Sequence, residues 1–304
     1  PYPETTGYVI PTFYDYAQLT QKEEIFERAR LMADWEIEVQ LPSGGVQGGH
    51  YVGSTADRRP VTFNTGQVIL GWVRAYTETA DEKYLDAAGR AGDWLLTAQS
   101  TDGAWRLDGP VVHTNVHAYD ARTAWSLLEL DALLNGGLYA EAAHRNLEWT
   151  LAQQQENGWF RNNNFNLDCQ APTHSISYVM EGLIESERLS GETRYLDAAL
   201  KTARELMRIF ETRGFMPGEF GADWNPIGKY SCLSGSAQIA GVWLQLSQKT
   251  GDMDFLYNAV KLNNQVKATQ RLRSLHPGVR GGVKGSFPLY ARYQPHCYPS
   301  WAAK

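Results

Sequence analysis

The sequence predicts an all-α fold built from tandem helical hairpins, because apolar residues show helical periodicity and one segment recurs along the chain. Residues 61–105 show a hairpin most clearly. The apolar positions of its first helix follow helical spacing: Val68, Ile69, Trp72, Val73 and Tyr76. After a polar break, the second helix carries its own stripe: Tyr84, Leu85, Ala88, Ala91, Leu95 and Leu96. Neither helix can bury its stripe alone, so we expect copies of the hairpin beside it.

The second helix of each hairpin carries a version of one segment. YLDAA at 84–88 recurs identically at 195–199, and related segments are YAEAA at 139–143, FLYNA at 255–259 and IFERA at 25–29. Successive copies begin 59, 55, 56 and 60 residues apart, and a glycine-containing turn follows each of the first four. Five hairpins without an intervening linker predict one domain over residues 1–304.

The predicted hairpins fill most of the chain in order. They are expected at residues 3–40, 61–105, 118–160, 173–210 and 231–272. In the first hairpin, helices are expected at 3–19 and 23–40, and the glycine-rich loop that follows is too long for a plain connector. The last residues, WAAK at 301–304, look like the start of a sixth first helix.

Composition excludes several classes of function. A formal net charge of −6 argues against a nucleic-acid groove. No apolar run approaches the roughly 20 residues that span a bilayer, so no membrane span is expected. The three cysteines show neither a disulfide framework nor a zinc spacing, and no metal or cofactor is expected. The chain lacks an initiator Met, so we interpret its ends as trimmed, and the compartment and oligomeric state stay open.

Several segments resemble known helical toroids. The hairpin period and the turns QSTDGAW at 99–105 and QENGWF at 155–160 resemble the (α/α)6 toroids. That superfamily includes terpenoid cyclases, uronate polysaccharide lyases, sugar 2-epimerases, glucuronyl C5-epimerases and glycoside hydrolases. The segments PETTGYVIPT, SCLSGSAQIA and GGVKGSFPLYARY are similar to a bacterial toroid group associated with exopolysaccharide and surface-polysaccharide gene sets. The resemblance implies an all-α (α/α)6 toroid, incomplete or nearly complete, that acts on glycans. The DxDD run of squalene-type cyclases is absent.

In a closed ring of hairpins, the starts of the first helices meet on one face, and we expect the functional site there. The residues at these starts are richer in chemistry than helix capping requires. They are Glu4, Tyr8, Asn64, Gln67, Tyr119, Asp120, Arg122, His174, Tyr178, Ser234, Gln238, Tyr298 and Trp301.

The first interpretation is a uronate lyase or C5-epimerase acting on an acidic polysaccharide or oligosaccharide. Abstraction of the proton beside a sugar carboxylate needs a neutralised carboxylate, a base and an acid. Toroidal lyases resemble this chain in using Asn, His, Tyr and Arg. The roles follow from position and chemistry: Asn64 with Gln67 for the carboxylate, His174 as base, Tyr119 or Tyr178 as acid, and Arg122 as charge clamp.

Further substrate contacts are expected from side chains in loops and at helix starts. They are Tyr8, Trp105, Trp159, Trp224, Gln238, Arg280, Lys284, Tyr298 and Trp301. Loop tryptophans can stack on sugars, although they can equally fill a helical core. Arg280 and Lys284 could bind additional uronates of a chain.

Two further interpretations stay open. An inverting glycoside hydrolase needs two carboxyls about 6.5–9.5 Å apart, for which Glu4 and Asp120 are the candidates and Glu219 and Asp223 the reserves. A non-catalytic glycan-binding ring would suit the same aromatic and amide side chains. Each residue also has a plainer explanation, since acids at helix starts favour the helix dipole and a lone histidine is often a packing residue.

A zinc site is a remaining, weaker possibility. Cys169, Cys232, His296, Cys297 and His174 faintly resemble the ligand set of toroidal lanthionine cyclases. Their spacing matches no zinc motif, and free cysteines are often simply buried.

Overall fold

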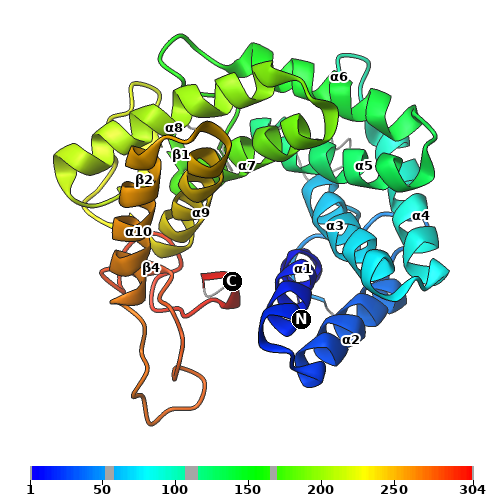
Figure 1. Ribbon diagram of the computed structural model, residues 1–304, viewed down its shortest axis with the longest axis horizontal. Coiled ribbons are helices and arrows are strands. Elements are labelled where there is room, and N and C mark those ends of the chain that lie inside the picture. Colours follow the sequence, from blue (N-terminus) through cyan, green and yellow to red (C-terminus); the bar gives the residue numbers. More distant parts are fainter. Residues whose placement is uncertain (1, 52–57, 107–115, 165–169, 303–304) are drawn as a thin grey trace. The chain divides into compact units, whose positions relative to one another are not determined.

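The computed structural model describes residues 2–51, 58–106, 116–164 and 170–302 (Figure 1). Its described part contains ten α-helices: α1 Pro3–Thr20, α2 Glu23–Val39, α3 Thr62–Thr79, α4 Glu82–Ala98, α5 Ala121–Leu134, α6 Leu138–Gln153, α7 Thr173–Ser190, α8 Thr193–Arg213, α9 Leu233–Thr250 and α10 Met253–Lys267. They pair as the five predicted hairpins, so the all-α prediction is confirmed. No helix in the described ranges is long and apolar enough to cross a membrane.

Short strands and 3-10 turns lie between the hairpins and after the last one. The strands are β1 Gln170–Pro172, β2 Glu219–Gly221, β3 Ser231–Cys232 and β4 Ser286–Phe287. β1 pairs antiparallel with β2, and β3 pairs antiparallel with β4. The 3-10 turn η1, Ala118–Asp120, leads into α5. Where a sixth first helix was expected, the structure has only the 3-10 turn η2, Ser300–Ala302, and residues 303 and 304 lie outside the described part.

The chain divides into two compact units, which are considered separately. The first unit comprises residues 1–116 and 120–149, and the second comprises residues 117–119 and 150–304. The division falls inside α6, and α1 to α5 belong to the first unit while α7 to α10 belong to the second, apart from η1, which is divided between them. The expectation of one domain over residues 1–304 stays a prediction.

Within each unit the first helices of successive hairpins pack against one another. In the first unit α1 packs on α3 and α3 on α5, and in the second α7 packs on α9. As a result α3 is buried at every residue from 62 to 73, and α7 at every residue from 173 to 180. The second helices instead bury one face, which includes the tyrosines of the repeated segment, Tyr84 and Tyr195. Polar residues at the starts of first helices are therefore deeply placed in their units.

A repeated glutamine joins each of the first three hairpins to the next. At the end of the second helix, the glutamine Nε2 donates to the carbonyl of the fourth residue in the next copy of the repeated segment. These bonds run from Gln40 to Ala87 at 2.9 Å, from Gln99 to Ala142 at 2.8 Å and from Gln154 to Ala198 at 2.8 Å.

The third turn begins one residue earlier than the sequence comparison placed it. Gln154 pairs with Phe160 as Gln99 pairs with Trp105, so the repeated glutamine is Gln154 and not Gln155. In the turn of the second hairpin, the backbone geometry requires a glycine. Gly103 has a φ of +90°, and a Cβ there would lie 2.3 Å from the carbonyl oxygen of Arg145.

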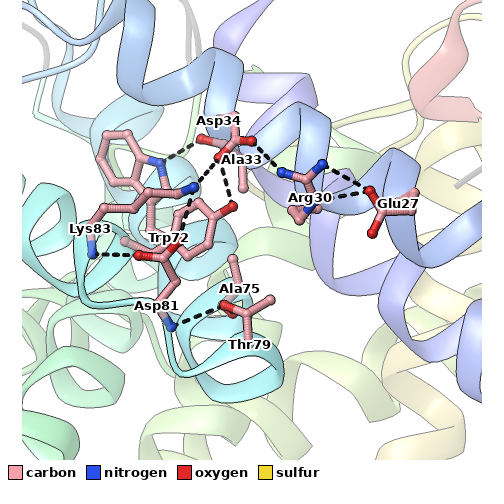
Figure 2. Close-up of polar contacts among 10 residues, drawn as sticks. Glu27, Arg30, Ala33, Asp34, Trp72, Ala75, Thr79, Asp81 and Lys83 are labelled. Carbon is pink, nitrogen blue, oxygen red and sulfur yellow. Dashed lines mark hydrogen bonds and ion pairs between the residues drawn. The ribbon is translucent and has the colours of Figure 1, made fainter.

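The repeated tyrosine bonds back to the preceding hairpin. Figure 2 shows Asp34 on α2 with Lys83 of α4, whose Nζ lies 3.0 Å from Asp34 Oδ1. The Tyr84 hydroxyl donates to the same oxygen at 2.7 Å. The equivalent Tyr139 donates to Asp93 at 2.8 Å, so both bonds link a repeated tyrosine to an acid on the previous second helix. The recurring segment is thus explained by contacts between hairpins.

Candidate functional site

The start of α7 holds the principal polar and aromatic group of the second unit. We call His117, Tyr119, His174, Tyr178, Cys232 and Tyr293 the second-unit cluster. His174 and Tyr178 are four residues apart on α7 and therefore share one face of the helix. Their ring centroids are 5.8 Å apart in an edge-to-face arrangement. Both side chains are buried.

Three further rings complete the cluster. Tyr119, from η1, lies edge-to-face with Tyr178 at 6.4 Å, and His117 stacks on Tyr119 at 4.4 Å. From far along the chain, Tyr293 places its ring 4.7 Å from that of His174, and its hydroxyl accepts a hydrogen bond from Trp301 Nε1 at 3.0 Å. The structure thus brings together the predicted base and both predicted acids.

His174 is uncharged in this environment. Burial lowers the pKa of His174 to about 3, because an imidazolium would lose its hydration there. Cys232 Sγ lies 3.8 Å from His174 Nδ1, and burial raises the pKa of the Cys232 thiol to about 12. If the His174 proton sits on Nδ1 and points at the sulfur, the ring lone pair is on Nε2. His174 is then a neutral base whose ring is oriented by its contact with the neutral Cys232 thiol.

Close helix packing fixes the position of His174. A Cβ at Gly235, in the first turn of α9, would lie 2.7 Å from the backbone nitrogen of His174. Only glycine permits this approach of α9 to α7. Nearby, the Ser177 hydroxyl donates to Gln238 Oε1 at 2.9 Å, so Gln238 ties the two helices together. The site is therefore held by the packed first helices.

The first unit has a differently composed group at the starts of α1 and α5. We call Glu4, Tyr8 and Arg122 the first-unit cluster. The Arg122 guanidinium carbon lies 6.0 Å from the centre of the Tyr8 ring, and Arg122 is buried. Burial raises the pKa of Glu4 to about 7, and the positive charge of Arg122 opposes that rise. This cluster combines a protonatable carboxyl with a permanent cation.

The remaining predicted residues of the first unit are buried on neighbouring helices. Burial raises the pKa of Asp120 well above its ordinary value. Asn64 Nδ2 donates to the Gln47 carbonyl at 3.1 Å, which ties the start of α3 to the preceding loop. The Gln67 amide is fully buried and has no hydrogen-bond partner among the described residues.

The three predicted stacking tryptophans are buried parts of the turns. Trp105 Nε1 donates to the Leu95 carbonyl at 3.0 Å, and Trp224 Nε1 donates to the Asn157 carbonyl at 2.9 Å. Trp159 packs edge-to-face on Trp224 with 5.2 Å between ring centres. Because backbone carbonyls hold Trp105 and Trp224 in their turns and Trp159 packs on Trp224, we leave these tryptophans out of the proposals below.

The other predicted binding and reserve residues lie in the loops of the second unit. Arg280 is exposed, and Lys284, Tyr298 and Trp301 are partly exposed. The reserve acid Glu219 accepts from the Tyr230 hydroxyl at 3.3 Å and pairs with Arg292 at 3.4 Å. Asp223 is exposed.

No group of three or more His, Cys, Asp or Glu side chains placed to hold a metal ion occurs in the described ranges. His296 and Cys297 are exposed, and Cys169 lies outside those ranges. Of the residues grouped as possible zinc ligands, Cys232 and His174 do lie in contact. Tyr293 was missed altogether, because no local motif links it to a histidine more than a hundred positions earlier in the chain.

One buried acid belongs to neither cluster. Glu36 on α2 is fully buried, and neither carboxyl oxygen has a hydrogen-bond partner in the part of the chain that the structure describes. Burial raises its pKa well above the ordinary value. Burial without a hydrogen-bond partner thus disfavours the charged form of this carboxyl.

Comparison with known proteins identifies one family. A family model described as the ulvan lyase N-terminal domain matches residues 59–233. The match covers the second, third and fourth hairpins and extends to the first residue of α9, so it includes Asn64, Arg122 and His174. No curated protein matches the sequence.

Several solved structures have a similar fold. A sugar epimerase from a ruminal bacterium is 16% identical with a TM-score of 0.74, covering 98% of this chain and 82% of that one. Cellobiose 2-epimerase from Bacillus thermoamylovorans is 12% identical with a TM-score of 0.74, covering 94% and 80%. An unsaturated glucuronyl hydrolase specific for heparin is 16% identical with a TM-score of 0.68, covering 90% and 76%. These similarities confirm the (α/α)6 toroid fold class.

Proposed function

The chain belongs to the ulvan lyase N-terminal domain family, and on this premise we propose that it is a lyase for a uronate-containing polysaccharide. A carbohydrate-active role is established at the level of the family. The reaction type is our proposal, and the observation that carries it is the contact of His174 with Tyr178 inside the second-unit cluster.

The proposed reaction is a β-elimination. His174 Nε2 takes the proton from the sugar carbon beside the carboxylate, and the released electron pair forms the new carbon–carbon double bond. The bond to the leaving glycosidic oxygen breaks, and that oxygen takes a proton from the Tyr178 hydroxyl. His174 gains one proton and Tyr178 loses one, so a single proton transfer between them or through solvent restores the enzyme.

The low pKa of His174 fits an anionic substrate. An imidazole with a pKa of about 3 is a weak base in the free protein. A sugar carboxylate bound beside the ring would stabilise the imidazolium and raise that pKa towards the range where a base is effective. The substrate would thus strengthen its own base. A neutral sugar would not.

The test is product analysis on a panel of uronate polysaccharides. We expect the ultraviolet absorbance of a conjugated double bond and new reducing ends to rise together. His174→Ala should lower both rates by a factor on the order of 10² to 10⁴, the usual contribution of a positioned base. The matched control is His144→Ala, on the second helix α6 and outside both clusters.

Two results would contradict the lyase proposal. Full activity in His174→Ala would show that His174 is not the base. Exchange of the sugar proton with heavy water, without bond cleavage, would instead identify a C5-epimerase that uses the same proton abstraction.

A second candidate function is an inverting glycoside hydrolase, favoured by the pKa of about 7 at Glu4. A carboxyl that stays protonated near neutral pH can act as a general acid, with Asp120 as the second carboxyl. Reducing ends without ultraviolet absorbance, lost in Glu4→Gln, would support this candidate over the lyase.

A further inference from the structure

The charge of this protein is distributed unevenly along the chain. Residues 255–304 contain eight Lys or Arg and no Asp or Glu, a formal charge of +8. The preceding 254 residues carry −14. The charged side chains of residues 255–304 are thus all basic, although the chain as a whole is acidic. Most of this positive charge lies in the long loop after α10, which Figure 1 shows.

Residues 271–284 form a loop with a closed base, which we call the basic loop. The Arg271 N–H donates to the Gly282 carbonyl at 3.1 Å, and the Gly281 N–H donates to the Arg271 carbonyl at 2.8 Å. Gln270 Nε2 adds a bond to the Gly281 carbonyl at 2.8 Å. Within the loop, the Arg280 N–H donates to the His276 carbonyl at 3.0 Å. These bonds give the loop a defined shape.

The cations of the basic loop are exposed and uncompensated. Arg271, Arg273 and Arg280 are exposed, and none forms an ion pair with any residue that the structure describes. Arginines elsewhere behave differently: Arg30, Arg145, Arg188 and Arg208 each pair with an acid three or four residues away. Clustered cations without acids nearby produce a positive potential that attracts polyanions.

Exposed aromatic rings follow the basic loop. Phe287 is 53% exposed and Tyr290 is 72% exposed. Lys284 Nζ lies 5.4 Å from the centre of the Phe287 ring, so the basic loop and this aromatic surface are continuous. Charged groups and flat apolar faces together suit a chain of acidic sugars, whose rings have both carboxylates and apolar C–H faces.

We propose that the basic loop, with Phe287 and Tyr290, is a binding surface for anionic stretches of polysaccharide, separate from both clusters. The proposal rests on the proposed function only for the choice of a glycan as the polyanion. None of the residues of this surface belongs to the second-unit cluster, so the surface takes no part in the proposed elimination. Its role is to hold a long substrate. A short basic segment on an otherwise acidic chain suits a flexible polyanion.

The test measures binding without turnover. In a His174→Ala background, Arg271→Gln, Arg273→Gln and Arg280→Gln are combined. The matched control combines Lys22→Gln, Arg28→Gln and Arg204→Gln, three exposed cations on helix surfaces or at a helix end. Calorimetry with alginate or polygalacturonate should show affinity weakened on the order of tenfold in the loop variant but not in the control, with the difference shrinking at high salt.

Several outcomes would overturn the proposal. Equal affinity in the loop and control variants would exclude the loop. Equal binding of neutral dextran would exclude recognition by charge. Tighter binding of RNA or of anionic lipid vesicles than of polysaccharide, lost in the loop variant, would assign the surface to another polyanion.

Failure of this proposal can be distinguished from failure of the lyase proposal. Loop-dependent binding to a protein that yields no elimination product would leave the surface intact and remove the lyase. Elimination by the wild-type protein, together with normal polysaccharide binding by the loop variant, would support the lyase and exclude the binding surface.

Discussion

The two clusters occupy the same structural position, at the starts of buried first helices, yet they carry opposite kinds of chemistry. In the first unit, Glu4 and Arg122 bring a carboxyl and a permanent cation into a buried setting. In the second unit, burial disfavours the charged forms of His174 and Cys232, beside which the Tyr178 ring lies. The scaffold sets the position, and the side chains set the chemistry.

This difference determines what each cluster can do in a reaction. A neutral imidazole beside phenol hydroxyls can move protons without creating a buried charge until the substrate supplies one. A carboxyl with a pKa near 7 can donate a proton at neutral pH, and a guanidinium can neutralise a carboxylate. The following experiments ask which cluster carries the chemistry.

The largest effect is expected inside the second-unit cluster, where two tyrosines compete for the role of acid. Tyr178 contacts the His174 ring directly, whereas Tyr119 contacts Tyr178. Tyr178→Phe should therefore lower kcat by on the order of 10² or more, and Tyr119→Phe by less than about tenfold. Both changes keep the ring and remove only the hydroxyl, so steady-state kinetics compare the two directly. A larger loss in Tyr119→Phe would reverse the assignment.

The next comparison uses pH, since the two clusters titrate in different ranges. His174 is an active base only when neutral, which burial ensures above about pH 3. Glu4 is an active acid only when protonated, which holds below about pH 7. If the second-unit cluster acts, kcat/KM should not fall as pH rises through about 7, because His174 stays neutral there and no protonated Glu4 is needed.

The outcome that contradicts this expectation is equally specific. A decline in kcat/KM as pH rises through about 7 would indicate that Glu4 must be protonated. Its disappearance in Glu4→Gln, which mimics the neutral carboxyl, would assign that decline to Glu4 and move the chemistry to the first unit.

The sequence predicted the scaffold well and the second-unit cluster only in part. Hairpins could be predicted because helical periodicity and a repeated segment are local patterns, and the packed helices obey them. The starts of the first helices could be predicted as polar, and His174, Tyr119 and Tyr178 do lie together. Residues that reach the cluster from distant loops could not be found in this way.

Tyr293 and the loop tryptophans illustrate why. Tyr293 contacts His174 only through the path of the chain after α10, which has no periodicity to follow. Trp105 and Trp224 lie in loops by sequence, but their rings are buried and their indole N–H groups donate to backbone carbonyls. Burial of a loop side chain depends on tertiary packing, and one sequence does not show it.

The smallest expected effect tests whether the two units share one scaffold. Gln99 in the first unit and Gln154 in the second make the same bond to the next hairpin. Replacing either by Ala leaves a carbonyl without its partner and should lower the free energy of unfolding by about 1–2 kcal/mol. Gln99→Ala should be the more costly, because Gln99 Oε1 also accepts from Arg145 Nη2 at 2.7 Å.

The control for this pair is the adjacent residue. Gln155 is exposed, so Gln155→Ala should change the free energy of unfolding by less than about 0.5 kcal/mol in urea denaturation. A cost at Gln155 equal to that at Gln154 would mean that the repeat begins where the sequence first placed it. A cost in one unit only would mean that the two clusters stand on scaffolds of unequal construction, and that their different chemistry cannot be attributed to side chains alone.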